Sequence, residues 1–220
     1  MDDKALIWSG NGKRLCVFQF GDLCTHSGVF VNDETKSAFV VDAPFGSYES
    51  LKSSLLRGVN VEALLITHGH WDHIGDDYLF RKDGAGVYAH SGDRQVIENP
   101  KLMIPYIGSD MGVCPCPIDH TIGDDHHFEA AGVEILSRGV PGHSPGSVIF
   151  YLKCAGVAFV GDTLFRDGIG RCDFFGGNGK LLVSGIKEKI LSLPEDTIII
   201  PGHGRFTTVE YERRNNNYLR

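Results

Sequence analysis

The sequence lacks a long apolar run, a signal-peptide pattern and an excess of positive charge, and each absence argues against one class of protein. No apolar run approaches the roughly 18 consecutive residues that a membrane-spanning helix needs. Residues 1–4 carry acidic side chains and lack the basic and then apolar pattern of a secretory signal peptide. Positive charge is scarce, because 21 Lys and Arg against 28 Asp and Glu give a formal net charge of −7. We therefore expect a cytoplasmic protein that binds neither membranes nor nucleic acid.

The cysteines do not cluster, and their distribution does not indicate a disulfide framework. Six cysteines are scattered through 220 residues, a length that can bury a sizeable core without covalent cross-links. We expect reduced thiols, and Cys114 and Cys116 lack the second pair that a typical cysteine metal site contains. A hydrophobic content of 42% with 22% charged residues is typical of a globular protein. The length fits a single domain over residues 1–220.

One stretch of the chain is rich in metal-binding side chains. Residues 67–73 read Thr-His-Gly-His-Trp-Asp-His and directly follow an apolar run that predicts a buried strand. His68 and His70, two positions apart in an extended segment, project to the same side and can bind one ion. Asp72 and His73 are displaced by the following turn and point to a second position. Neutral imidazole and carboxylate are ligands of zinc and of other divalent first-row metals, so the stretch predicts a metal site.

Strand and helix patterns come in two blocks that are alike in order. Apolar runs between turn signals predict strands at residues 15–20, 24–32, 37–41, 61–66, 86–90, 125–130, 133–138, 147–153, 157–160 and 198–200. Helices are predicted from an N-cap at Ser47 to residue 57, from residue 72 or 76 to before 84, over 93–98, and from an N-cap at Asn178 to residue 193. This order favours an α+β fold of two packed sheets with helices outside.

Residues 99–120 contain four prolines and little periodicity. They predict a long loop, which we place over the mouth of the site because loops of this length are often functional. A surface loop without a function is the alternative.

Three further polar residues stand where apolar strands end, each beside a glycine. His143 lies in Pro-Gly-His-Ser-Pro-Gly, Asp162 in Gly-Asp-Thr, and His203 in Pro-Gly-His-Gly. Glycine lets the backbone come close to a cluster and adopt angles closed to other residues. Taken singly, each is equally consistent with an ordinary turn residue. Together with the stretch at 67–73 they complete a set of seven potential ligands.

The order of these motifs resembles the metallo-β-lactamase superfamily, and the resemblance spans nearly the whole chain. Residues 161–165 (Gly-Asp-Thr-Leu-Phe), 169–174 (Ile-Gly-Arg-Cys-Asp-Phe) and the tail from 201–204 to 212–215 are similar to the short glyoxalase II-like hydrolases. The resemblance implies an αβ/βα sandwich of two mixed β-sheets flanked by helices. It also implies metals at one edge, between the sheets.

The resemblance further implies a role for each potential ligand. Two divalent metal ions would be bound, the first by His68, His70 and His143, the second by Asp72, His73 and His203, with Asp162 bridging the two. Zinc is the expected metal, although iron and manganese accept the same nitrogen and oxygen ligands. The common β-lactamases of the superfamily lack a bridging aspartate, so we do not expect β-lactam hydrolysis as the main activity.

The implied chemistry is hydrolysis. Two divalent ions about 3.5–4 Å apart can share a hydroxide, the candidate nucleophile, which makes Asp72 and Asp162 the candidate catalytic residues. A metal would polarise the substrate carbonyl and stabilise the tetrahedral oxyanion. A thiolate leaves with little protonation, so the expected small-molecule substrate is a thioester such as a 2-hydroxyacyl (lactoyl) thiol.

Two arginines are candidate substrate-binding residues. Arg171 stands where the glyoxalase II family has a basic residue that contacts glutathione, and an ion pair with Asp173 is its alternative role. Arg205 replaces the family's tyrosine two residues after the last metal-binding histidine. The family's C-terminal helical domain is absent from the 220 residues. These departures argue against strict specificity for glutathione.

Two other activities remain open on the same fold. A persulfide dioxygenase, which is a mononuclear-iron oxidoreductase, also has a Gly-Arg-x-Asp-Phe segment. It usually has Pro-Ala-His-Asp-Tyr where this chain has Pro-Gly-His-Gly-Arg, which favours the hydrolase. A lactonase would use the same seven ligands and differ only in its substrate pocket. The oligomeric state is not indicated by the sequence.

Overall fold

The computed structural model describes residues 5–220 and consists of two β-sheets packed face to face. The first sheet has the order β1 (Ala5–Gly10), β2 (Lys13–Phe20), β3 (Thr25–Asn32), β4 (Ser37–Val41), β5 (Asn60–Leu65), β6 (Gly86–His90), β7 (His120–Ile122). The second has the order β15 (Thr207–Thr208), β14 (Ile198–Pro201), β11 (Val157–Gly161), β10 (Val148–Leu152), β9 (Val133–Gly139), β8 (His126–Ala130). Both contain parallel and antiparallel pairs, so the predicted sandwich of two mixed sheets is confirmed.

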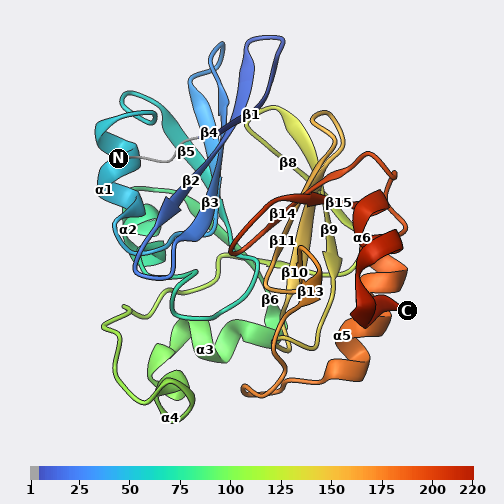
Figure 1. Ribbon diagram of the computed structural model, residues 1–220. Helices are drawn as coiled ribbons and strands as arrows, with labels where there is room; N and C mark the ends of the chain where they lie inside the picture. The colour runs from blue at the N-terminus through green and yellow to red at the C-terminus, as the bar shows by residue number, and fades with distance from the viewer. Residues whose placement is uncertain (1–4) are drawn as a thin grey trace.

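Helices cover the outer faces of both sheets, as Figure 1 shows. Beside the first sheet lie α1 (Ser47–Ser53) and α2 (Asp77–Lys82), and beside the second lie α5 (Gly179–Gly185), the π-helical turn η3 (Ile186–Ile190) and α6 (Val209–Asn215). At one end of the sandwich lie the short turns η1 (Ser91–Asp93) and η2 (Pro100–Met103) with α3 (Arg94–Glu98) and α4 (Ile104–Ile107). The hairpin β12 (Leu164–Phe165) and β13 (Gly168–Ile169) and the turn η4 (Asn217–Leu219) complete the fold.

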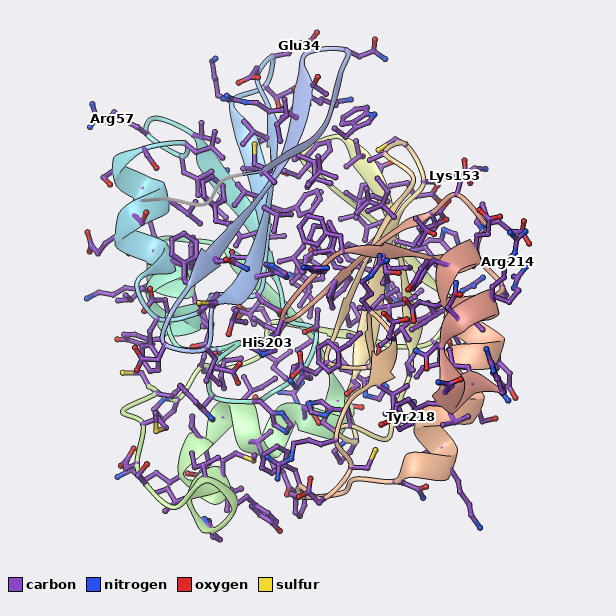
Figure 2. The ribbon with its side chains drawn as sticks, viewed as in Figure 1. Glu34, Arg57, Lys153, His203, Arg214 and Tyr218 are labelled. Atoms are coloured by element: carbon purple, nitrogen blue, oxygen red, sulfur yellow. The ribbon has the colours of Figure 1, made fainter. Side chains whose placement is uncertain are left out.

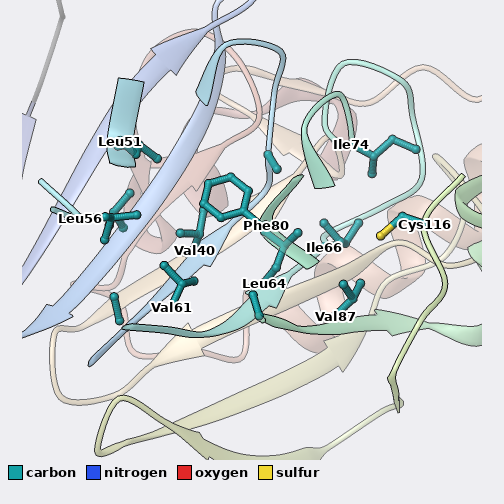
Figure 3. Packing of buried hydrophobic residues seen from close by; sticks show 14 of the residues in the cluster. Val40, Leu51, Leu56, Val61, Leu64, Ile66, Ile74, Phe80, Val87 and Cys116 are labelled. Atoms are coloured by element: carbon teal, nitrogen blue, oxygen red, sulfur yellow. The ribbon is translucent and has the colours of Figure 1, made fainter. Parts of the chain in front are cut away.

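The central strands are buried on both faces, and their side chains alternate between two cores. In β3, Val29 and Val31 belong to the core under α1 and α2, whereas Phe30 belongs to the core between the sheets. Figure 3 shows the outer core, in which Leu64 packs near Phe80 of α2. A third core lies between the second sheet and its helices. The long apolar runs in the sequence therefore correspond to strands that are buried on both faces of their sheet.

One predicted helix, α1, begins and ends differently in the structure. The N-cap of α1 is Gly46 rather than Ser47, and the cap contact comes from elsewhere, because the Asp76 carboxylate accepts a hydrogen bond from Tyr48 N at 3.0 Å. The helix ends at Ser53 instead of residue 57. The Ser54 hydroxyl bonds to the carbonyl of Ser50 at 2.6 Å and so competes with continuation of the helix.

The segment 99–120 is not a structureless loop, which corrects that prediction. It contains η2, α4 and the edge strand β7. Pro100 and Pro105 lie in the first turns of η2 and α4. Backbone N–H groups in a first turn have no partner within the helix, so the N–H that proline lacks is not missed there, and its fixed φ favours the start of a helix. Strands β1 and β15 and helix α6 were not predicted. The predicted N-cap Asn178 is confirmed, since its side chain accepts from Leu181 N at 3.1 Å.

Two expectations from composition can be compared with residues 5–220. No helix there combines the length and the apolarity that crossing a bilayer requires. All six cysteines lie in this range, and none forms a disulfide.

A buried acid in the outer core predicts pH-dependent stability. The Asp77 side chain is fully buried beside Cys116; one oxygen accepts from Tyr78 N at 2.6 Å, and Oδ2 has no hydrogen-bond partner among the described residues. Burial raises the pKa of Asp77 well above 3.8. The protonated acid is favoured in the folded state, so its contribution to stability is present at low pH and is lost as pH rises through the folded pKa.

We therefore expect Asp77→Asn to stabilise the protein by about 1–3 kcal/mol at pH 8 and by less at pH 5. Urea unfolding at the two pH values measures the difference. Asp33→Asn, which removes a half-exposed partner of Arg14, is the matched control and should change stability by less than about 1 kcal/mol. A gain that is equal at both pH values would contradict the raised pKa of Asp77.

Candidate metal centre

The seven predicted ligands meet at one end of the sandwich although they come from four separate loops. His68, His70, Asp72 and His73 follow β5, whereas His143, Asp162 and His203 follow β9, β11 and β14. Because β11 and β14 are parallel neighbours, their carboxyl ends bring Asp162 and His203 to the same edge. Figure 2 shows His203 between the two halves of the molecule.

The first group consists of three buried imidazoles, those of His68, His70 and His143, whose donor atoms lie within 4.8 Å of one another. The Nε2 atom of His143 is 3.2 Å from His68 Nε2 and 2.9 Å from His70 Nδ1. Burial, together with the neighbouring His143, lowers the pKa of His70 to about 3. Burial also lowers the pKa values of His68 and His143. Three neutral rings therefore aim nitrogen atoms at one point.

The second group combines Asp72, His73 and His203. The Oδ2 atom of Asp72 is 3.5 Å from His73 Nε2 and 3.1 Å from His203 Nε2, and it accepts a hydrogen bond from Thr25 Oγ1 at 3.0 Å. Burial opposes protonation of His203, but its hydrogen bonds to the Asp162 and Asp72 carboxylates outweigh this and raise its pKa to about 10. Without a cation, protons on the imidazoles balance the carboxylates, so cation binding here should release protons.

Asp162 lies between the two groups. Its carboxylate oxygens are 3.4 Å from His73 Nε2, 3.5 Å from His203 Nε2 and 3.7 Å from His143 Nε2. Burial opposes its charge, but His73 and the hydrogen bond with His203 hold the pKa of Asp162 well below its usual value. One carboxylate is thus within reach of both groups.

Hydrogen bonds on the outer side of the rings determine which nitrogen faces the cluster. A carbonyl oxygen can only accept, so His143 donates from Nδ1 to Arg171 O at 2.8 Å, and His203 donates from Nδ1 to Leu23 O at 3.1 Å. His73 Nδ1 is 2.7 Å from Asp42 Oδ2. In each ring Nε2 is therefore the nitrogen that faces the cluster, which is how metal-binding histidines are usually oriented.

Two buried atoms at the centre support a fit to metal ions. Among residues 5–220, His73 Nε2 and Asp162 Oδ1 are buried side-chain atoms without a hydrogen-bond partner. The two atoms face each other at 3.4 Å, which is an ion-pair distance but leaves both hydrogen-bonding positions unfilled, and such buried atoms are costly unless a ligand satisfies them. The donor set, nitrogen from imidazole and oxygen from carboxylate, suits divalent first-row metals. The residues present therefore fit one ion in each group.

Asp42 is one of the supporting residues that the sequence analysis missed. It directly follows β4, accepts from Thr67 N at 2.8 Å and from Thr67 Oγ1 at 2.7 Å, and contacts His73. It follows an apolar strand just as Asp162 does, so the strand-end signal that found Asp162 could also have found it. Thr25, which donates to Asp72, begins β3 and so is not marked by a position after an apolar strand.

A cavity of about 150 Å³ opens onto both groups of potential ligands. Besides predicted ligands it is lined by Leu23, Trp71, Met103, Ile107, Phe174 and Arg171. Met103 and Ile107 come from η2 and α4, so the segment 99–120 does lie against the site as predicted. Most of the wall is therefore apolar.

The two predicted substrate-binding arginines lie in different places. Arg171 lines the cavity, and it also pairs with Asp173 at 2.6 Å and stacks over the Phe174 ring at 4.1 Å. Arg205 is exposed in a separate hollow of about 490 Å³ that shares His203 with the cavity. Within the described chain no ion-pair partner is found for Arg205. Arg166 and Asp167 also line this hollow.

Comparisons with known proteins agree with this geometry. The family model of the metallo-beta-lactamase superfamily matches residues 21–203. The hydroxyacylglutathione hydrolase GloC of Haemophilus influenzae is 34% identical over 195 residues, which cover 85% of this chain and 89% of GloC. The crystal structure of BLEG-1, a B3 metallo-beta-lactamase, superposes with a TM-score of 0.85 at 35% identity and covers 93% of this chain and 99% of its own.

A di-iron-bound crystal structure of TTHA1623 has a TM-score of 0.79 at 30% identity, covering 91% of this chain and 98% of that chain. The family uses metal ions, and the present chain has a His and Asp cluster at one end of the same fold. This chain belongs to the metallo-beta-lactamase superfamily and is a hydrolase of that family.

Proposed function

We propose that the protein is a dinuclear metal-dependent thioester hydrolase of the glyoxalase II type. The observation that carries the proposal is the arrangement of two three-residue groups with Asp162 in reach of both. The similarity to GloC supports a thioester substrate, and the di-iron form of TTHA1623 supports two ions. Zinc is the metal we propose, with iron or manganese as the alternatives that the same donors accept.

His68, His70 and His143 would hold one ion, Asp72, His73 and His203 the other, and Asp162 would contact both. When bound, such ions lower the pKa of a coordinated water towards about 7 and polarise a substrate carbonyl. Asp72 and Asp162 are negatively charged and face the cavity, so they orient a water between the groups and accept its hydrogen bonds. Thr25 fixes the Asp72 carboxylate by donating to it.

The apolar wall and the neighbouring hollow suggest how a small-molecule thioester binds. The acyl group would lie in the cavity against Trp71 and Met103, which exclude bulk water. The thiol arm would extend past His203 into the hollow, where the free guanidinium of Arg205 can meet a carboxylate. Arg171 would contact the substrate at the cavity wall while Asp173 holds its side chain.

Replacing Arg205 by Ala is expected to raise KM about tenfold for a thioester with an anionic thiol arm and to leave kcat nearly unchanged, because the arginine binds a part of the substrate that does not react. Steady-state kinetics with anionic and uncharged thiol arms measure this, and KM for the uncharged substrate should not change. Arg57→Ala is the matched control, since Arg57 is exposed on the side of α1, well apart from His203 (Figure 2). Equal effects on both substrates would contradict the role given to Arg205.

The function is tested by metal content per chain on protein purified without added metal, assayed alongside hydrolysis of lactoyl and other acyl thioesters. We expect close to two ions and thioester turnover that a chelator abolishes. A single iron with persulfide-dependent oxygen uptake would instead identify a dioxygenase. BLEG-1 is described as a metallo-beta-lactamase, so β-lactams are assayed as well as lactones. Turnover of either that is faster than turnover of thioesters would reassign the substrate.

A further inference from the structure

A buried carboxylate outside the proposed ligand set lies directly behind the first group. The Asp93 side chain, at the junction of η1 and α3, is 1% exposed. Its Oδ2 atom accepts from Gly69 N at 2.8 Å and from Ser144 Oγ at 2.6 Å, and its Oδ1 atom accepts from Gly146 N at 2.7 Å. All three hydrogen bonds come from loops that carry predicted ligands.

The donors are placed next to the three imidazoles of the first group. Gly69 stands between His68 and His70, in the loop after β5 of the first sheet. Ser144 directly follows His143, in the loop after β9 of the second sheet. A backbone hydrogen bond from Val148 N to Thr67 O at 2.9 Å also joins these segments, but it does so at the strand ends. Asp93 is the side chain that ties the two loops together beside the rings.

The polar side chains around Asp93 satisfy one another's hydrogen bonds. The Ser144 hydroxyl uses its proton on Asp93, so Ser147 must donate in the 2.7 Å contact between the two hydroxyls. The Ser147 oxygen in turn accepts from Ser144 N at 3.1 Å. Every donor and acceptor has a partner, and a buried network of this kind holds one geometry.

The two ligand loops pack tightly against the segment that carries Asp93. A Cβ atom on Gly146 would lie 2.7 Å from Asp93 Cγ, and one on Gly69 would lie 2.5 Å from Val96 Cγ2 of α3. Both loops are therefore in van der Waals contact with the segment that carries Asp93. The position of Asp93 decides how far apart the loops stand.

We propose that Asp93 is a positioning residue that sets the separation of His68 and His70 from His143, and so the metal affinity of the first group. The inference rests on the metal centre of the proposed function and is independent of the substrate. Thr25 and Asp42 act on the second group and on the start of the loop, whereas Asp93 acts on the loops that carry the first group.

The test is Asp93→Asn. In either orientation, the amide NH₂ faces one of the backbone donors, Gly69 N–H or Gly146 N–H, so one hydrogen bond becomes a repulsive contact. Competition with a chromophoric chelator measures the two stepwise dissociation constants for Zn²⁺. We expect one constant to rise about 10–100-fold and the other to change by less than about threefold. We also expect thioester turnover lost at limiting Zn²⁺ to return at excess Zn²⁺.

Asp119→Asn is the matched control, because this carboxylate also accepts from a backbone donor, Val87 N, and from Arg81, but touches no ligand loop. It should leave both constants unchanged. If Asp93→Asn fails to fold, Ser144→Ala removes a single bond to Asp93 and should weaken the same constant several-fold.

Equal weakening of both constants, or no change in either, would overturn the proposal. Wild-type protein that binds no Zn²⁺ would overturn it together with the metal centre. Selective weakening in a protein that hydrolyses no thioester would support the role of Asp93 and refute only the proposed substrate.

Discussion

Replacing Asp162 by Asn is expected to reduce thioester hydrolysis about 1,000-fold or more and to leave fewer than two metal ions per chain. The Asp162 side chain lies within 3.7 Å of imidazoles from both groups. Asparagine keeps the shape but removes the negative charge that would compensate the two proposed cations. A loss of about 4 kcal/mol of stabilisation in the transition state corresponds to this factor.

Metal content and kcat/KM measured on the same preparation check the prediction. Thermal unfolding of metal-free Asp162→Asn and wild-type protein separates a site effect from a fold effect. Asp33→Asn is again a suitable control, because it changes an acid of the same size outside the site and should keep full activity. An Asp162→Asn variant that retains two ions and activity within tenfold of the wild type would contradict the role of Asp162 as a ligand shared by both ions.

Replacing Gly202 by Ala is expected to reduce hydrolysis about 100-fold while the chain still folds. A Cβ atom at this position would lie 2.1 Å from Asp162 Oδ1 and 2.6 Å from His73 Cε1. Gly202 does not have a positive φ, so alanine causes no backbone strain and acts through this contact alone. The methyl group must displace Asp162 or His73, and displacement of about 1 Å at a reacting centre costs roughly this factor.

Gly123→Ala provides the matched comparison, since Gly123 also lacks a positive φ and a Cβ atom there would have no neighbour within 4 Å. We expect Gly123→Ala to keep wild-type activity, metal content and thermal stability. Far-ultraviolet circular dichroism and metal analysis of both variants complete the test. Wild-type activity in Gly202→Ala would mean that the centre tolerates an additional methyl group, contrary to the packing described above.

The sequence alone predicted the sandwich, most of its strands and the seven clustered residues. It did so because strand ends deliver side chains to an edge, and the polar residues at 68–73, 143, 162 and 203 all follow apolar strands. The helices were predicted less well. Ser47 looked like an N-cap, but Asp76 from another element supplies the contact, which no local pattern reveals.

Other features depend on contacts between distant segments, and only the tertiary structure decided them. Asp93 joins loops of two different sheets, and its own neighbours in the sequence give no sign of this. Arg171 and Arg205 both looked like substrate residues, yet the fold pairs Arg171 with Asp173 and leaves Arg205 free in a separate hollow.

By itself, then, the sequence determined the fold class and the residues that cluster, because periodicity and ligand spacing are local properties of the chain, and its motifs carried the resemblance to the family. The tertiary structure decided which ring nitrogens face the cluster, which carboxylates support them and which side chains line the cavity. Those features arise from hydrogen bonds such as that of His143 to Arg171 O, which join residues far apart in the chain. Packing of the two sheets brings such partners together, and no local pattern encodes it.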